Sequence, residues 1–346
     1  MRKLLICFAI ALAMGAGAVK AAMPEVRIAV LKFGTVNWVM DTIKRQGYDT
    51  AAGYRLVVRG YAGKAVTTIA FEAGEVDLLV SDWFWGPRQR GKGRDLRFQP
   101  YSNALGALIV TPEITDLCAV RGRRIGIVGG KFDKSWLLYQ ALARRDCGAE
   151  LAAGSEVLFG APPLMARQLR DGQLDAVSTF WHWSARMQAA GARRLIDAAG
   201  AMAKLDIAPA PAMIGYLWDR GRSDDAAITR FLVSVRNGQA LLAHDDDAWR
   251  ALKPRMKGVD AAARALLRRH YVAGVPRPWT PADTAAAGRL HALLIDQALA
   301  VADRLLELGG SPARLVSDRR SPLSRQARGD PRARADLQAR WFPAPS

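Results

Sequence analysis

Cysteine and histidine are scarce in this 346-residue chain, which contains three of the first and four of the second. Their spacing matches no metal site, and the serine elbow, the HExxH helix and the glycine-rich phosphate loop are also missing. No pair of carboxylates stands at a convincing catalytic spacing. These absences exclude the common hydrolase and metalloenzyme classes. We therefore expect a protein that is not an enzyme and that uses neither a metal nor a cofactor.

Long hydrophobic runs are missing too, apart from one at the N-terminus. A basic start, Met1-Arg2-Lys3, precedes an apolar run from Leu4 to Ala18, and Val19-Lys20-Ala21 offers small residues for cleavage. The run is shorter than the roughly 20 residues that span a membrane. This layout is typical of a secretory signal peptide. We expect residues 1–21 to be removed near Ala21 and the product to be soluble and periplasmic.

Acidic residues are outnumbered, since the chain has 50 Lys and Arg against 32 Asp and Glu and a formal net charge of +18. Three of these cations leave with the signal peptide, which reduces the charge to 18 − 3 = 15. Many others lie in residues 318–346, a basic segment without periodicity that we expect to be a disordered tail. No basic run is interleaved with aromatic residues, so a nucleic-acid partner is not expected.

Tryptophan, by contrast, is plentiful and repeats. The segment from Ala73 to Trp85 returns as Asp171 to Trp183, with an offset of 98 (172 − 74) between Gly74 and Gly172. Six of the ten tryptophans pair at that offset: Trp38 with Trp136, Trp83 with Trp181, and Trp85 with Trp183. The offset is much longer than the period of a solenoid or a propeller. It predicts two similar lobes, with a ligand cleft between them.

Each copy of the repeat alternates short apolar runs with amphipathic stretches. This alternation predicts doubly wound α/β lobes with parallel sheets and helices on their faces. Apolar stretches at 103–110 and 211–218 are expected where the chain passes between lobes. We assign 24–110 and 211–310 to lobe 1 and 111–210 to lobe 2. After Asp219 the pattern is helical, with a capping box at Thr280–Asp283, and we expect this part to pack on lobe 1.

Two cysteines, Cys118 and Cys147, remain after processing. A predicted strand at 124–128 and a predicted helix at 134–145 would run antiparallel, which brings the end of the helix near the segment entering the strand. A disulfide is plausible in an exported protein, and two buried free thiols are the alternative.

Candidate ligand residues follow the strands, because open α/β sheets bind ligands at the carboxyl ends of their strands. Thr35, Asn37, Asp133 and Ser135 stand before helices, where such residues cap the helix, contact an anion, or do both. Lys134 is a candidate for the anionic end of a ligand.

Ser81, Asp82, Trp83, Trp181 and His182 follow the two repeated strands. Trp83 and Trp181 are candidates for a ring clamp around the ligand, with core packing as the alternative. Asp82 is expected to bind a donor or a cation on the ligand, or to pair with Arg88 or Arg90. His182 is either a wall residue or structural. Asp77 and Asp175 are interpreted as turn caps.

These features together resemble the substrate-binding proteins of ABC importers. The runs Phe33-Gly34-Thr35-Val36-Asn37-Trp38, Lys134-Ser135-Trp136-Leu137-Leu138 and Phe159-Gly160-Ala161-Pro162-Pro163 are similar to the nitrate/sulfonate/taurine (SsuA/TauA-like) branch, over roughly residues 24–310. The resemblance implies a type II periplasmic binding protein fold, hinge closure on a small solute, and delivery to a membrane permease with its ATPase by a monomer.

Two other functions stay open. A binding protein of this kind can feed a membrane receptor instead of a permease, and relatives of this fold that do chemistry make a pyrimidine precursor. The second is disfavoured because those enzymes carry a Cys-rich motif that this chain lacks. The solute itself is expected to be a small organic anion, a zwitterion or a flat heteroaromatic molecule.

Overall fold

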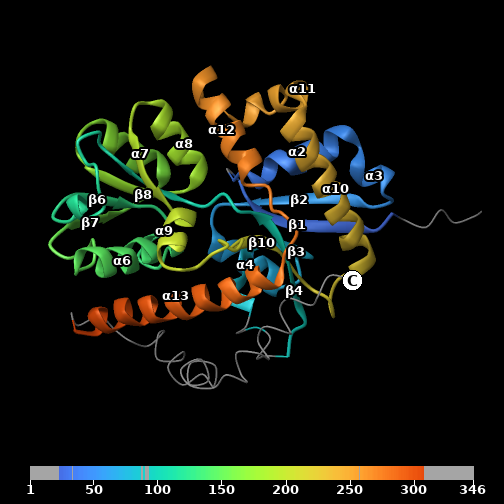
Figure 1. Cartoon of the computed structure of the whole chain (residues 1–346). Helices are drawn as coiled ribbons and strands as arrows, with labels where there is room; N and C mark the ends of the chain where they lie inside the picture. The colour runs from blue at the N-terminus through green and yellow to red at the C-terminus, as the bar shows by residue number, and fades with distance from the viewer. Residues whose placement is uncertain (1–22, 33, 87–88, 90–92, 257, 308–346) are drawn as a thin grey trace, which may run out of the picture.

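The computed structural model describes residues 23–32, 34–86, 89, 93–256 and 258–307. The predicted signal peptide (1–21) and basic tail (318–346) lie outside the described residues. Figure 1 shows two groups of strands side by side, each covered by helices. They form two five-stranded sheets, which we call the cores of lobe 1 and lobe 2.

The sheet of lobe 1 has the strand order β2-β1-β3-β10-β4. Its strands are β1 Glu25–Leu31, β2 Arg55–Tyr61, β3 Leu78–Asp82, β4 Leu96–Ser102 and β10 Ile214–Asp219. β1 is parallel to β2 and β3, whereas β10 is antiparallel to both of its neighbours. The helices that follow these strands are α2 Val36–Gln46, α3 Tyr48–Ala51 and α4 Lys64–Glu72, and a 3-10 turn, Trp83–Trp85, follows β3.

The sheet of lobe 2 has the order β7-β6-β8-β5-β9. Its strands are β5 Ala107–Val110, β6 Arg124–Ile127, β7 Glu156–Phe159, β8 Ala176–Thr179 and β9 Arg193–Asp197. Its helices are α6 Lys134–Cys147, α7 Pro162–Arg170, α8 Trp181–Ala189 and α9 Ala198–Lys204. β6 is parallel to β7 and β8, and β5 is antiparallel to β8 and β9.

The two sheets share one plan, which explains the sequence repeat. Read across each sheet, the strands correspond one to one: β2 to β7, β1 to β6, β3 to β8, β10 to β5, and β4 to β9. The predicted α/β class is confirmed, but the sheets are mixed, because the fourth strand of each is antiparallel. That strand is also where the chain changes lobe. β5 lies in the second sheet, so residues 107–110 belong to lobe 2 and the predicted boundary at 110 is a few residues late.

A matched ion pair anchors β1 in lobe 1 and the corresponding strand β6 in lobe 2. Asp77 accepts hydrogen bonds from the backbone nitrogen (2.8 Å) and the guanidinium nitrogens Nε (3.0 Å) and Nη2 (2.6 Å) of Arg27. Asp175 does the same for Arg124, at 2.9, 3.0 and 2.7 Å. These aspartates therefore join two strands, which is a different role from the predicted turn cap.

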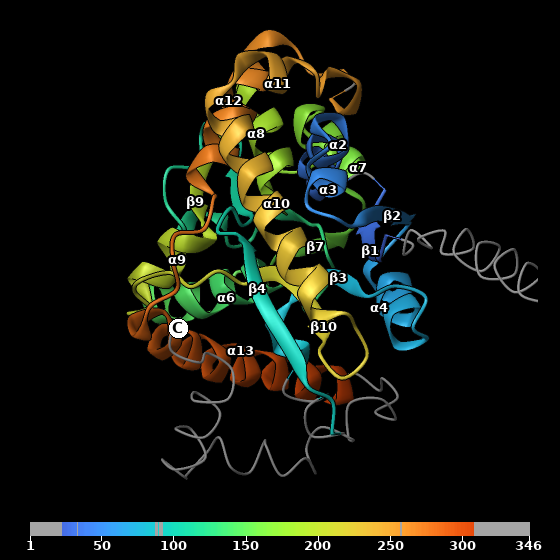
Figure 2. The same cartoon turned by 90° about the vertical axis from the view of Figure 1, so that its right-hand side faces the viewer.

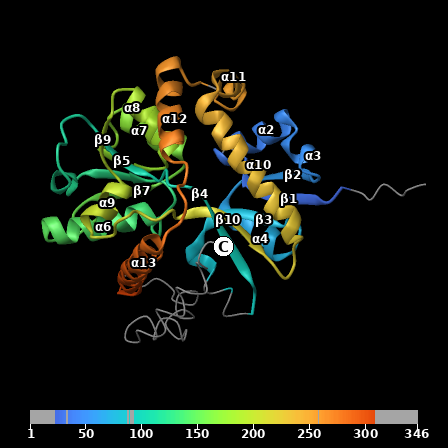
Figure 3. The same cartoon turned by 45° about the vertical axis from the view of Figure 1, so that its right-hand side comes forward.

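The C-terminal helices divide between the lobes, so the prediction that they pack on lobe 1 is wrong in part. They are α10 Asp225–His244, α11 Asp246–Arg250, α12 Ala261–Ala273 and α13 Pro281–Glu307. α10 packs on α2 and covers one face of the first sheet, opposite α4 (Figure 2). α12 packs on α8, and α13 lies along α6 (Figure 3).

The reason is the apolar stripe of α13. Ala286, Ala287, Leu290 and Leu294 are buried in one cluster with Trp136, Leu137 and other apolar residues of lobe 2. The predicted capping box is present, since Asp283 accepts from the backbone nitrogen of Thr280 at 2.8 Å and the Thr280 hydroxyl accepts from the backbone nitrogen of Asp283 at 3.3 Å. No helix within the described residues is both long and apolar enough to cross a membrane.

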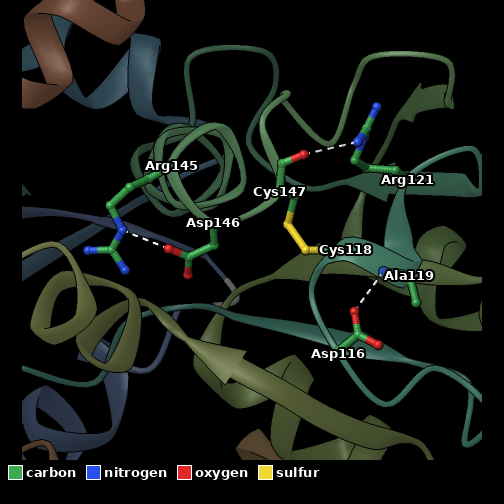
Figure 4. Close-up of a disulfide and its surroundings, with 7 residues drawn as sticks. All are labelled: Asp116, Cys118, Ala119, Arg121, Arg145, Asp146 and Cys147. Carbon is green, nitrogen blue, oxygen red and sulfur yellow. Dashed lines mark hydrogen bonds and ion pairs between the residues drawn. A yellow bond between two sulfur atoms is a disulfide. The ribbon is translucent and has the colours of Figure 1, made fainter.

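Cys118 and Cys147 form a disulfide, with their Cα atoms 5.5 Å apart. α6 ends at Cys147, beside the turn Cys118–Val120 that leads to β6, as the antiparallel strand and helix predict. Figure 4 shows Arg121 next to the bond; its guanidinium donates to the Cys147 carbonyl at 3.2 Å. The bond fixes the C-terminal end of α6 to the sheet of lobe 2.

Candidate functional site

Where the two lobes meet, tryptophan rings from both lobes pack against each other. Trp38, in α2 of lobe 1, packs edge-on against Trp181, the first residue of α8 in lobe 2, with ring centroids 5.7 Å apart. Trp249 and Tyr271, from α11 and α12, lie 5.5 and 5.8 Å from Trp38. We call these four rings the aromatic contact. Trp38 is 4% and Trp181 9% exposed, so the aromatic contact is buried.

The tryptophans at the equivalent positions of the repeat are also buried. The offset of 98 relates Trp38 to Trp136 and Trp181 to Trp83, and Trp136 and Trp83 lie in one buried cluster. Trp83 stacks on Phe84 at 4.0 Å and donates from Nε1 to the Ala212 carbonyl at 3.0 Å. The helix tryptophan of one lobe and the strand-end tryptophan of the other are therefore buried in the same cluster in this second case as well.

The predicted clamp by Trp83 and Trp181 is therefore not found as a facing pair. The two indoles belong to different buried clusters. Strand alternation alone indicated that both rings leave their sheets at the same edge, but not which ring each would meet. Contact of either ring with a ligand stays a prediction.

An ion cluster lies where β3 meets α6. Asp82 is the last residue of β3, and its Oδ2 accepts from Lys64 Nζ at 2.9 Å and contacts Lys134 Nζ at 3.0 Å. Lys64 begins α4 in lobe 1, whereas Lys134 begins α6 in lobe 2. The side chain of Asp82 is 10% exposed and those of Lys64 and Lys134 are 56% and 34% exposed. One carboxylate therefore holds one lysine from each lobe.

Pairing of Asp82 with two lysines was not among the alternatives predicted for it, and contact of Asp82 with a ligand stays a prediction. Arg88 and Arg90 lie outside the described residues. Burial alone would raise the pKa of the Asp82 carboxyl, but the charges and hydrogen bonds of Lys64 and Lys134 lower it to about 2. The carboxylate is therefore ionised throughout the physiological range.

We predict that Asp82→Asn lowers the free energy of unfolding by about 1–3 kcal/mol at pH 7. Because the folded-state pKa is depressed, this stabilisation is present above the unfolded-state pKa of about 3.9 and is lost as the pH falls towards 2. Denaturant unfolding of both proteins between pH 7 and pH 2 should show their difference shrinking below about pH 4. A difference that stays constant over that range would contradict the assignment.

The polar residues after β1 build their own loop. Asn37 is 4% exposed, and its Nδ2 donates to the carbonyls of Leu31 and Gly34, both at 2.8 Å. Thr35 is the N-cap residue of α2, but its side chain makes no capping hydrogen bond. Its hydroxyl instead pairs with the buried phenol of Tyr101. The structure thus gives Asn37 a structural role, and contact of Thr35 or Asn37 with a ligand stays a prediction.

The loop before α6 combines capping with dense packing. Asp133 accepts from the backbone nitrogen of Trp136 at 3.1 Å, the expected N-cap, and burial raises the pKa of its carboxyl. Ser135 is 8% exposed. A Cβ on Gly106 would lie 2.4 Å from the Thr179 carbonyl oxygen and 3.1 Å from Ser135 Oγ. Only glycine fits there, so β5, β8 and α6 meet closely at the carboxyl end of the sheet.

Sequence reasoning missed two kinds of residue at this edge. The side-chain oxygens of Ser178 and Thr179, at the end of β8, are buried without a hydrogen-bond partner. Two adjacent hydroxyl residues before the Phe180-Trp181 pair were the available signal. Lys64 was missed because the loop between β2 and α4 was not among the strand-end loops chosen as candidates. Ser81 is partly exposed and pairs with Gly215 of β10.

His182 lies among aromatic rings, 5.7 Å from Trp181 and 6.3 Å from Phe180 between centroids. Burial, with a smaller effect from the Arg186 charge, lowers the pKa of its imidazole to about 3. It is uncharged at neutral pH, so it provides a hydrogen-bonding ring and no positive charge.

A basic groove of about 710 Å³ lies between α11 and α12. It is lined by none of the ten residues predicted to bind the ligand. Arg268 in this groove already pairs with Asp246 and covers the Trp249 ring, 5.9 Å from its centroid. Among the described residues, no three His, Cys, Asp or Glu side chains are placed to hold a metal ion.

No protein-family profile and no curated protein matches this sequence. Solved structures do. The chain is similar to the periplasmic aliphatic sulphonate binding protein SsuA from Escherichia coli, with 16% identity, 80% of this chain and 88% of that chain covered, and a TM-score of 0.63.

It is also similar to the alkanesulfonate-binding protein SsuA from Xanthomonas axonopodis pv. citri bound to MOPS (16% identity, 81% and 95% covered, TM-score 0.62). A third similar structure is the ligand binding component of an ABC-type import system from Staphylococcus aureus (11% identity, 80% and 92% covered, TM-score 0.60). At these identities the likeness concerns the fold, and the chain has the type II periplasmic binding protein fold.

Proposed function

We propose that this chain is an exported solute-binding protein that holds a small organic anion between its two lobes and delivers it to an ABC import permease and its ATPase. The observation that carries the proposal is the interlobe contact. The strand ends of one lobe lie against the helix starts of the other, and this is where ligands bind in open α/β sheets.

The chemistry of that contact favours an anion with an apolar part. Lys64 and Lys134 bring two positive charges to the end of β3. The repeat places Phe180 at the position equivalent to Asp82 and Val36 at the position equivalent to Lys134. The equivalent positions are thus charged in one case and apolar in the other. A solute that contacts both would use a charged head and a hydrocarbon or flat body.

The similar structures support the same class. One is an aliphatic sulphonate binding protein, and another is an alkanesulfonate-binding protein bound to MOPS. All of these ligands are sulfonates attached to an organic body. The periplasmic location, the monomeric state and the signal peptide are part of the proposal. The transfer partner is the permease, since another of the similar proteins is a component of an ABC-type import system.

The test is a thermal-shift and calorimetric screen of the mature chain against ethanesulfonate, benzenesulfonate, benzoate and taurine. We expect at least one organic anion to raise the melting temperature and to bind with a defined stoichiometry. Lys134→Gln should weaken that binding about tenfold or more, because a charge-assisted contact contributes roughly 1.5–3 kcal/mol.

Lys131→Gln is the matched control. Lys131 lies three residues earlier in the same loop and is exposed, so this variant should bind like the wild type. Absence of binding to every anion, or equal weakening by the two variants, would contradict the proposal.

A further inference from the structure

We propose that Asp82 is an internal stand-in for the charged group of the solute: it holds Lys134 across the two lobes until an anion displaces it. This inference rests on the proposed function for the identity of the displacing anion. The part that concerns the lobes themselves can be tested without any solute.

The first step is the geometry of the ion cluster. A single oxygen, Asp82 Oδ2, lies 2.9 Å from Lys64 Nζ and 3.0 Å from Lys134 Nζ. Asp82 and Lys64 belong to lobe 1 and Lys134 belongs to lobe 2. The Asp82–Lys64 pair therefore stays within one lobe, whereas the Asp82–Lys134 pair joins the two and must break when they separate.

The second step is the asymmetry of the repeat. The lobes are otherwise matched at this edge, with tryptophans at equivalent positions, yet the equivalents of Asp82 and Lys134 are Phe180 and Val36. Fold architecture alone therefore does not require an ion pair here, because the other copy has uncharged residues at these positions. The ion pair is found at the end of β3, where Lys64 and Lys134 both lie close to Asp82.

The third step is the chemistry of exchange. The carboxylate of Asp82 is nearly buried, and its partner Lys134 is about one-third exposed. Lys134 Nζ also lies 6.0 Å from the centre of the Phe84 ring, in lobe 1. An anion that arrives from solvent can reach the ammonium of Lys134 and replace one charge-assisted contact with another. Lys64 remains on Asp82 and keeps the released carboxylate paired.

Two consequences distinguish this arrangement from a purely structural ion pair. With no solute bound, the Asp82–Lys134 pair favours the state in which the lobes touch. Removing the charge of Asp82 frees Lys134, so anions bind more tightly although a carboxylate has been lost. A carboxylate that instead receives a cationic part of the solute would give the opposite change.

The first experiment measures the radius of gyration by small-angle scattering at low salt without solute, for the wild type, Lys64→Gln and Lys134→Gln. We expect Lys134→Gln to be larger than the wild type and Lys64→Gln to be equal to it, because only the first loses an interlobe contact. Equal radii for all three proteins would overturn the proposal.

The second experiment measures benzenesulfonate binding to the wild type and Asp82→Asn by calorimetry, with near-ultraviolet circular dichroism to confirm that the variant is folded. We expect binding to strengthen about 3- to 10-fold. Weaker binding by Asp82→Asn would overturn the role of stand-in. If benzenesulfonate binds neither protein, the proposed ligand class fails, and the scattering comparison still decides whether the pair holds the lobes.

Discussion

Replacing Trp181 with alanine should lower the free energy of unfolding by about 3–5 kcal/mol, the cost of removing a large buried aromatic side chain. Trp181 is 9% exposed and packs against Trp38 of the other lobe, within a cluster that also contains Trp249 and Tyr271. Its removal would leave a cavity that residues from α2, α8, α11 and α12 surround. Denaturant unfolding, followed by circular dichroism, measures the loss.

Trp183→Ala is the matched control, two residues further along α8. Trp183 is half-buried and its ring lies under the guanidinium of Arg186, at 4.8 Å. We expect a loss of about 1 kcal/mol or less, the scale of a cation–π contact at an accessible site. Equal losses in the two variants would contradict the packing described for Trp181. If Trp181→Ala stayed stable but no longer bound any solute, the ring would act on the ligand and not in the core.

Replacing both Cys118 and Cys147 with serine should lower the free energy of unfolding by roughly 3–4 kcal/mol, because the bond closes a loop of sequence separation 29 in the unfolded chain. The single variant Cys118→Ser, kept reduced, should lose a similar amount, since either change removes the crosslink. Peptide mapping without reduction of the protein isolated from its natural compartment tests whether the bond forms there. Two free thiols in that material would sink the prediction.

The sequence predicted those parts of the fold that local pattern and spacing determine. The offset of 98 indicated two similar lobes, and the strands of the two sheets do correspond one to one. The closeness of Cys118 and Cys147 followed from one strand and one antiparallel helix. Such features depend on neighbours in the chain or on a fixed repeat, so they are readable from one sequence.

Contacts between distant elements were harder to predict. The apolar stripe of α13 indicated that one face is buried, but Leu290 and Leu294 carry no information about which lobe covers them. The way the two lobes pack on each other brings Trp181 to Trp38, and no spacing in the sequence records that packing. Asp82 could be identified as an unusual buried acid, yet nothing in the local pattern around Lys64, which begins α4 after β2, indicates that it meets the end of β3.

The position of β10 has a consequence for the order in which the molecule assembles. All five strands of the second sheet come from one continuous stretch, residues 107–197. The first sheet cannot be finished so early, because β10 lies between β3 and β4 and is made after the whole of the second sheet. During synthesis or export, β4 therefore has no partner on that side until residues 214–219 arrive. Lobe 2 should fold first, and the late insertion of one central strand should then complete lobe 1.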